Sequence, residues 1–222
     1  MIIYQDERLV AVAKPSGCSV IMDRIRAEEP LADQVGRLIG TRALVVHRLD
    51  RGASGLVIFA KDAATHRALN DMFAARAIHK SYLVAVSGRV ESDGVVDRPL
   101  RVFGSGRVGV CPADDPRAKP SLSRYRILGL GSDASLLQVE PSTGRRHQIR
   151  VHLYSIGHPV LGDNRYGSPR PVGGALRLML HAWRLGFDLE GRGYSLCAPP
   201  GDDFVRLAEA RGLKMDPNFW PA

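Results

Sequence analysis

The chain has 222 residues, 45% of them hydrophobic, which is enough apolar material for one large domain or two small lobes. It has no long apolar run and its N-terminus turns acidic within one strand length, so we expect neither a transmembrane helix nor a signal peptide. With 31 Lys and Arg against 23 Asp and Glu the net charge is +8, which suits a polyanionic partner such as RNA, DNA or a membrane surface.

The cysteines indicate a reducing compartment. Cys18, Cys111 and Cys197 are widely spaced and odd in number, which supports neither a disulfide framework nor a zinc ribbon. We therefore expect a cytoplasmic protein.

The N-terminal quarter predicts two strand pairs separated by a helix. Strands are expected over 2–4 and 9–13, where apolar residues flank a polar turn. Apolar residues recur at helical spacing over 31–39, and Gly40 provides a natural end for that helix. Over 45–59, two β-branched runs flank a tight polar segment, which predicts a strand, a turn and a second strand.

The middle of the chain predicts one helix, one strand and an irregular segment. Asp62 is a suitable N-cap for a helix that carries Leu69 and neighbouring apolar residues on one face. A strand is expected over 82–86. Residues 88–120 are rich in Gly, Pro and charge, so we expect irregular structure with short strands there.

The remaining chain predicts a further strand pair, a helix, a long strand and a closing helix. The helix is expected to begin near Thr143 and to stop at Gly157. The other expected elements are strands over 122–128, 136–139 and 176–189 and a helix over 202–211.

Short, locally paired strands with a few helices between them indicate an α+β protein. A regular alternation of strand and helix, which would indicate a parallel sheet, is missing from the predicted elements. We expect a mixed, largely antiparallel β-sheet core with flanking helices, in a single domain spanning residues 1–222.

Asp50 is the most informative carboxylate, because it lies between Arg48 and Arg51 in the predicted turn. Neighbouring arginines hold a carboxylate ionised, which suits either a salt bridge or a nucleophile. An ordinary hairpin with a solvated Asp explains the same pattern. Ser54 as a nucleophile would need a base partner, and the sequence identifies none.

A second basic group surrounds the helix expected near Thr143. Arg145, Arg146 and Arg150 add to the positive field of the helix N-terminus, where phosphate oxygens can bind. Tyr82 offers a ring for stacking on a base and a hydroxyl for proton transfer. Surface charge and a half-buried aromatic explain these residues equally well, so both interpretations stay open.

Histidine spacing does not predict a metal site. His147 and His152 are five residues apart, which does not align two ligands on one helical face. His47, His158 and His181 are isolated and are expected to be hydrogen-bonded structural residues. No glycine-rich phosphate loop is present either.

The motifs resemble those of the RluA-type pseudouridine synthases, which isomerise uridine in RNA to its C-glycoside. The stretch 47–50, followed by Ser54-Gly55-Leu56, is similar to the family's signature around its nucleophilic aspartate. Lys80-Ser81-Tyr82 resembles the segment with the active-site tyrosine, and 143–153 resembles the arginine motif. The resemblance is collinear over nearly the whole chain.

The resemblance implies a pseudouridine synthase fold with a central active-site cleft and a role for each matched residue. Asp50 would be the nucleophile, attacking C1′ of the ribose or C6 of the uracil, Tyr82 would assist proton loss, and Arg145 would pair with Asp50. Arg48 would hold the target nucleotide out of its stack. The cations expected to bind RNA are Arg48, Arg51, Lys80, Arg146 and Arg150.

The resemblance also implies that no metal or organic cofactor is needed and that the partner is tRNA, rRNA or both. We expect no membrane partner, no S4 RNA-binding module, and a monomer. Gly52-Ala53 departs from the family, which commonly has a polar residue and threonine there, so the loop is expected to be looser. The alternatives are a non-catalytic RNA-binding or ribosome-assembly factor on the same scaffold, and a metal-dependent RNA-processing enzyme, which the missing ligands disfavour.

Overall fold

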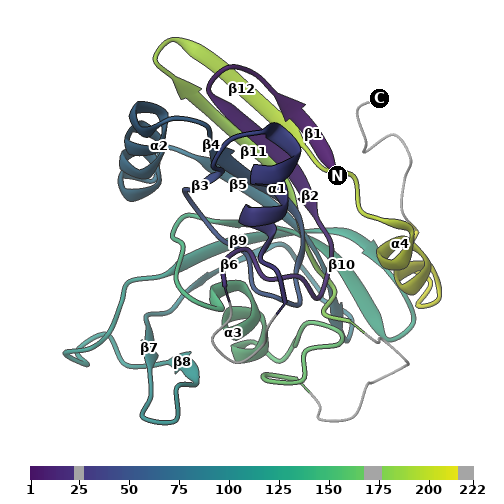
Figure 1. Cartoon of the computed structure of the whole chain (residues 1–222). Coiled ribbons are helices and arrows are strands. Elements are labelled where there is room, and N and C mark those ends of the chain that lie inside the picture. Colours follow the sequence, from purple (N-terminus) through teal and green to yellow (C-terminus); the bar gives the residue numbers. More distant parts are fainter. Residues whose placement is uncertain (23–27, 168–176, 215–222) are drawn as a thin grey trace. The chain divides into compact units, whose positions relative to one another are not determined.

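The structure is a computed structural model that describes residues 1–22, 28–167 and 177–214 (Figure 1). The chain divides into two compact units. Unit 1 comprises Met1–Lys80 and His181–Pro200, and unit 2 comprises Ser81–Leu180 and Gly201–Ala222. Both combine helices with mostly antiparallel strands, so the expected α+β class is confirmed. No helix among the described residues is long and apolar enough to cross a membrane.

Unit 1 is a sheet with the strand order β1-β2-β4-β11-β12, and β3 also pairs with β4. All of these pairs are antiparallel except β4 with β11. The elements are β1 (Ile2–Gln5), β2 (Leu9–Lys14), α1 (Leu31–Ile39), β3 (Leu44–Val45), β4 (Ser54–Ala60), α2 (Ala63–Ala75), β11 (Leu180–Leu189) and β12 (Arg192–Cys197).

The two helices of unit 1 pack against opposite faces of its sheet. Successive residues of a strand point to opposite faces. Val57 and Phe59 of β4 accordingly pack in one apolar cluster with α1, whereas Leu56 and Ile58 pack in another with α2. Every residue of β4 is therefore buried, which explains why its sequence from Leu56 to Ala60 is continuously apolar rather than alternating.

Both helices of unit 1 follow their local sequence signals. α1 covers the predicted residues 31–39, and Gly40 ends it in the left-handed conformation at φ 69°. Asp62 caps α2 as predicted, because its carboxylate accepts a hydrogen bond from the backbone N–H of Thr65 at 2.8 Å.

Unit 2 contains an antiparallel sheet in the order β5-β10-β9-β6 and a separate β7–β8 hairpin. The segment 88–120 holds only short strands, as expected. The elements are β5 (His79–Ser87), β6 (Gly94–Asp97), β7 (Leu100–Val102), β8 (Val108–Val110), β9 (Leu122–Leu130), β10 (Ala134–Pro141), α3 (Gln148–Ser155) and α4 (Asp202–Glu209).

Two helix boundaries differ from the prediction. α3 begins at Gln148 and not near Thr143, because His147 adopts a left-handed backbone conformation with φ 55° that cannot continue a right-handed helix. α4 ends at Glu209, two residues before the expected end. The strand expected from Leu176 is observed as β11 from Leu180, and Leu176 lies outside the described residues.

Candidate active site

Asp50 lies in the loop that joins β3 to β4. The hairpin predicted there is confirmed, with Val45 opposite Phe59 in the antiparallel register. Asp50 is half-buried and Arg48 is exposed. The backbone N–H of Ala53 donates to the carbonyl of Asp50 at 3.1 Å, which closes a turn immediately before β4. The loop therefore presents one carboxylate at the entrance to a fully buried strand.

A buried lysine holds the backbone next to Asp50. Lys14 is only 1% exposed, and its ammonium donates to the carbonyl oxygens of Pro15 at 2.9 Å, Cys18 at 2.7 Å and Arg51 at 3.1 Å. Sequence reasoning missed this residue. The available signal was a lysine that ends the apolar run of β2 directly before a proline.

The same bend makes two further hydrogen bonds to the Asp50 loop. The backbone N–H of Gly17 donates to the carbonyl of Arg51 at 2.9 Å. The hydroxyl of Ser16 donates to the carbonyl of Gly52 at 2.7 Å. These hydrogen bonds hold the backbone of Arg51 and Gly52 in place. They therefore do not indicate the looser loop expected from Gly52-Ala53.

Ser54 and His181 meet because β4 and β11 run parallel, with these two residues in register. The Ser54 Oγ and the His181 Nδ1 are 2.8 Å apart, and His181 Nε2 lies 2.8 Å from the carbonyl of Ala198. A carbonyl only accepts, so Nε2 carries a proton, and in the neutral imidazole Nδ1 then accepts from the serine hydroxyl. Both side chains are buried, which makes the pair a support for the loop rather than an exposed nucleophile and base.

Gly55 permits this close approach of the two strands. Its φ of +108° is a conformation that side chains rarely adopt, and a Cβ there would lie 2.1 Å from the carbonyl oxygen of Ala182. Only glycine fits directly after Ser54.

His47 is a neutral structural residue, as expected. The backbone N–H of Ile58 donates to its Nε2 at 3.0 Å, and its ring stacks on Phe73 with centroids 4.8 Å apart. Burial, followed by the positive charge of Lys80, lowers the pKa of the His47 imidazole to about 3. The imidazole therefore serves as a hydrogen-bond acceptor at neutral pH.

The other candidate cations of unit 1 have different surroundings. Arg51 donates from Nη2 to both carboxylate oxygens of Glu28, at 2.8 and 2.7 Å. Lys80 is half-buried, and burial together with the charge of Arg76 lowers the pKa of its ammonium. Arg48 is the most exposed of the candidates in this unit.

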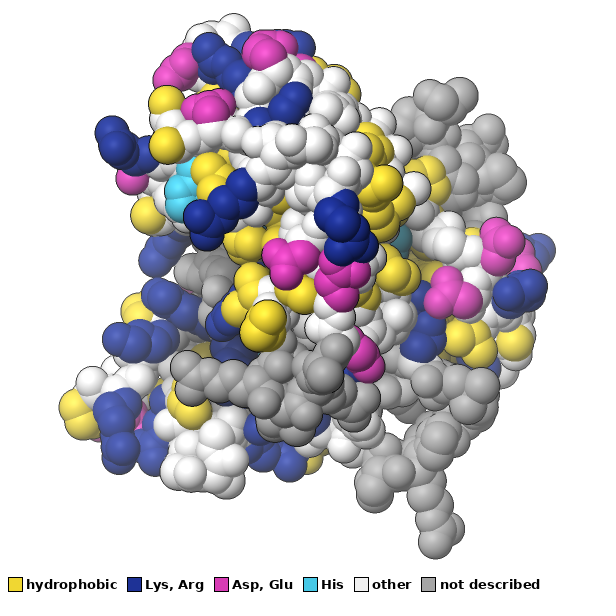
Figure 2. All heavy atoms as spheres, viewed as in Figure 1, with side chains coloured by type: hydrophobic (Ala, Val, Ile, Leu, Met, Phe, Trp, Pro, Cys, Tyr) yellow, Lys and Arg dark blue, Asp and Glu magenta, His cyan; other side chains and the backbone are white. Residues whose placement is uncertain are grey.

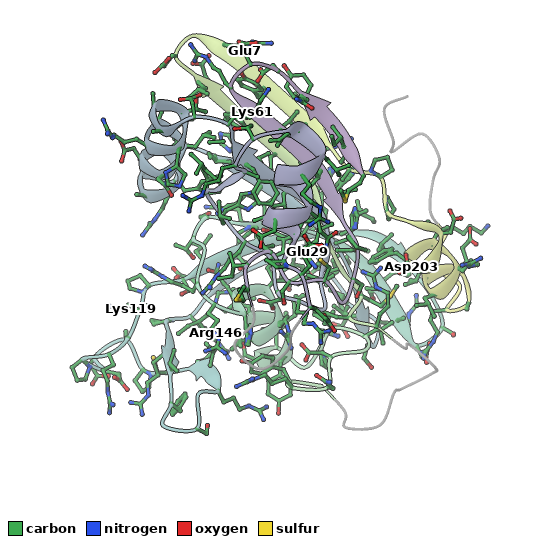
Figure 3. All side chains as sticks on the ribbon, viewed as in Figure 1. Glu7, Glu29, Lys61, Lys119, Arg146 and Asp203 are labelled. Carbon is green, nitrogen blue, oxygen red and sulfur yellow. The ribbon has the colours of Figure 1, made fainter. Side chains whose placement is uncertain are left out.

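Arg145 and Arg146 lie in the loop before α3, in unit 2. The Gln148 carbonyl Oε1 accepts from the hydroxyl of Thr143 at 2.6 Å and from the backbone N–H of Arg145 at 3.0 Å, which fixes the loop. Arg145 Nε donates to the carbonyl of Pro120 at 3.3 Å. Arg146 is exposed (Figure 3).

Arg150 is buried and paired. Its Nε and Nη2 donate to the two carboxylate oxygens of Asp163 at 2.7 and 2.8 Å. Burial alone would raise the pKa of the Asp163 carboxyl, but the hydrogen bonds and charge of Arg150 outweigh it and hold that pKa below its usual range. This geometry gives Arg150 a structural role.

Tyr82 lies in β5, opposite Val139 of β10, and is half-buried. Asp50, Arg48, Arg51 and Lys80 thus belong to unit 1, and Tyr82 and the three arginines of the α3 region belong to unit 2. Their joint action stays a prediction. Within the described residues, no three His, Cys, Asp or Glu side chains gather in a way that could hold a metal ion.

Comparison with known proteins gives consistent matches. The sequence pattern of the RNA pseudouridylate synthase family matches residues 8–155. The dual-specificity RNA pseudouridine synthase RluA of Salmonella typhi is 34% identical over 209 residues, covering 92% of this chain and 94% of the relative. The solved structure of human RNA pseudouridylate synthase domain containing 4 superposes with a TM-score of 0.79 at 26% identity, covering 96% of this chain and 94% of that chain.

Some relatives are longer. The ribosomal large subunit pseudouridine synthase D of Zymomonas mobilis is 36% identical over 202 residues, which cover 84% of this chain. The chain spans 64% of the length of that relative and also of synthase D from Nitrosomonas europaea.

We predict that replacing His47 flattens the acid dependence of stability. The folded state holds His47 neutral down to about pH 3, whereas an unfolded histidine protonates near pH 6.5. The contribution of neutral His47 to the free energy of unfolding is therefore complete above about pH 6.5. It is lost as the pH falls toward the pKa of His47 in the folded state. At pH 5 wild type should lose on the order of 1–2 kcal/mol from this source, and His47→Gln should not.

The measurement is the free energy of unfolding between pH 7.5 and 5, with His79→Gln at an exposed imidazole as the control. Identical pH slopes in wild type and His47→Gln would contradict the assignment.

We predict that Arg150 and Arg146 differ sharply in their effect on stability. Arg150→Met leaves the buried Asp163 carboxylate without its ion-pair partner, so the free energy of unfolding should fall by about 3–5 kcal/mol. Arg146→Met, at an exposed side chain, should change it by about 0.5 kcal/mol or less. Denaturant titration measures both, and a small effect of Arg150→Met would rule out the structural role.

Proposed function

Because this chain belongs to the RNA pseudouridylate synthase family, we propose that it isomerises uridines in RNA to pseudouridine. The family match confirms the resemblance drawn from the motifs. The observation that carries the proposal is the Asp50 loop, in which the backbone after the carboxylate is fastened by Lys14 and Ser16. A nucleophile needs this kind of rigid support, because a small displacement from the reacting atom costs much of the rate.

In the proposed reaction the Asp50 carboxylate attacks C1′ of the ribose or C6 of the uracil. The N-glycosidic bond breaks, and the uracil turns until its C5 faces C1′, where the new carbon–carbon bond forms. The bond to Asp50 breaks, which frees the carboxylate, and N1 of the uracil takes up a proton. A proton leaves C5 or C2′, and Tyr82 assists its transfer. Product and substrate have the same atoms, so the isomerisation consumes no cofactor.

The cations take two kinds of role in this proposal. Arg145 pairs with Asp50 and keeps it ionised, a part that we take from the family resemblance. Arg48 holds the target nucleotide out of its stack, and Lys80 and Arg146 contact phosphates. Arg51 and Arg150 are engaged with Glu28 and Asp163, which favours a structural role for both.

We propose tRNA, large-subunit rRNA or both as the substrate, because relatives named for each kind of RNA match this chain. We also propose a cytoplasmic location and a monomeric state. The location is supported by the three cysteines, which are free thiols as a reducing compartment would leave them.

The test is incubation of wild type and single variants with unmodified tRNA and rRNA transcripts, followed by mapping of pseudouridine. Asp50→Asn should lower turnover about 10³-fold or more, because an amide is not a nucleophile. Tyr82→Phe should keep RNA affinity while turnover falls about 10²-fold or more, because only the hydroxyl is lost. Asp71→Asn, at an exposed carboxylate on α2, is the matched control and should be unaffected.

The outcomes separate the proposal from its alternative. RNA binding by wild type with no pseudouridine formed on any transcript would favour the non-catalytic RNA-binding factor. Full activity of Asp50→Asn would remove the nucleophile assignment. Equal loss of binding and turnover in Tyr82→Phe would remove its part in proton transfer.

A further inference from the structure

Positive charge is concentrated in one part of unit 2. The segment from Arg98 to Arg126 contains seven Lys and Arg residues but only two acidic ones, Asp114 and Asp115, so it carries +5 of the chain's net +8. Asp115 is already ion-paired with Arg101. We call residues 98–126 the basic arm. The basic arm's share of the net positive charge is far larger than its share of the residues.

Most cations of the basic arm are exposed to solvent, and Arg101 is the half-buried exception. Arg107, Arg117, Lys119 and Arg124 are all exposed. Figure 2 shows Lys and Arg side chains gathered at the lower left, where Figure 1 places β7 and β8. Lys119 and Arg146 both lie in this part of unit 2 (Figure 3). The arm and the loop before α3 therefore present positive charge together.

Hydrogen bonds fasten the basic arm to the loop that carries Arg145 and Arg146. Arg145 Nε donates to the carbonyl of Pro120, next to Lys119. The buried Tyr166 links β8 of the arm to the same loop. Its hydroxyl lies 2.7 Å from His147 Nδ1 and accepts from the backbone N–H of Val108 at 3.2 Å. The backbone that carries the cations of the arm is thus held beside the arginine motif.

Apolar side chains also pack the β7–β8 hairpin of the arm against α3. Leu100 and Val108 of the β7–β8 hairpin are buried in one cluster with Val151 of α3 and Tyr166. Arg165 Nη2 also donates to the carbonyl of Gly106, at the turn of the hairpin, at 2.9 Å. A surface fixed before its ligand arrives loses less conformational entropy on binding.

We propose that the basic arm binds the phosphates of the RNA strand that flanks the target uridine. The inference rests on the proposed function, because the Arg145–Arg146 loop belongs to the proposed active site. An aromatic ring in the arm favours RNA over an acidic protein surface. Phe103 is 37% exposed and carries the Arg101 guanidinium 4.2 Å from its ring centroid, and such pairs of ring and cation suit bases and phosphates of single strands.

The arm is tested by neutralising three of its exposed cations. The variant Arg107→Gln, Arg117→Gln, Lys119→Gln is compared with a control that loses the same charge elsewhere, Arg42→Gln, Arg67→Gln, Arg206→Gln, also at exposed positions. The probe is a fluorescent 20-nucleotide oligouridylate, whose Kd is measured by anisotropy from 50 to 300 mM salt. Thermal unfolding confirms that both variants are folded.

Each lost phosphate contact to a single strand lowers the slope of log Kd against log salt by about 0.7. The arm variant should therefore show a slope lower by about 2 and a Kd raised about tenfold or more at 0.1 M salt, while the control stays near wild type. Unchanged slopes, or equal losses in the two triple variants, would overturn the proposal.

A second variant tests the aromatic ring. Phe103→Leu keeps an apolar side chain against Gly109 but removes the stacking face, so the Kd for the oligouridylate should rise about fivefold or more. Phe103→Trp keeps an aromatic face, so its Kd should stay near that of wild type. Equal affinities of both variants would remove the stacking role. A failure of the proposed function would be seen in a different experiment, in which wild type forms no pseudouridine. An active wild type whose arm variant binds normally defeats this inference alone.

Discussion

Three backbone carbonyl oxygens converge on the buried ammonium of Lys14, and the chain beside Asp50 depends on this cluster. One of the three belongs to Arg51, the residue after Asp50, and the other two belong to the bend that follows β2. A carbonyl that loses such a donor while buried costs about 1–3 kcal/mol, so the loop cannot move without a penalty. The lysine therefore joins two segments far apart in sequence and sets the backbone from which the carboxylate projects.

The rest of unit 1 supports the same loop from the strand side. β4 is buried on both faces between α1 and α2, and its parallel pairing with β11 brings His181 to Ser54. Gly55 allows that pairing because it has no Cβ to meet Ala182. In unit 2 the Gln148 side chain fixes the loop of Arg145 and Arg146 in a comparable way. In both units, hydrogen bonds from side chains hold the backbone of a loop while other, charged side chains project from it.

Local signals allowed much of the fold to be predicted from the sequence. The helix over 31–39 and the Asp62 cap depend only on neighbouring residues, and both are confirmed. The contacts of Lys14, and the Ser54–His181 pair separated by 127 positions, depend on strand pairing that no local pattern encodes. Arg150 had the helical spacing of a surface cation, but its partner Asp163 lies 13 residues further along the chain. The family motifs indicated Asp50 as the proposed nucleophile without showing what holds its backbone.

The most direct test of this account is the variant Lys14→Met, with single-turnover pseudouridine formation at saturating RNA measured beside the Kd for RNA. With Asp50 as the proposed nucleophile, the rate should fall about 10²-fold while the Kd changes about twofold or less, because Lys14 holds the backbone beside Asp50 and lies outside the basic arm. Lys61→Met is the matched control, since Lys61 also donates to a backbone carbonyl, that of Asp6 at 2.6 Å, and its loss should leave the rate unchanged. A folded Lys14→Met enzyme that reacts at the wild-type rate would contradict the claim that this buried ammonium positions Asp50.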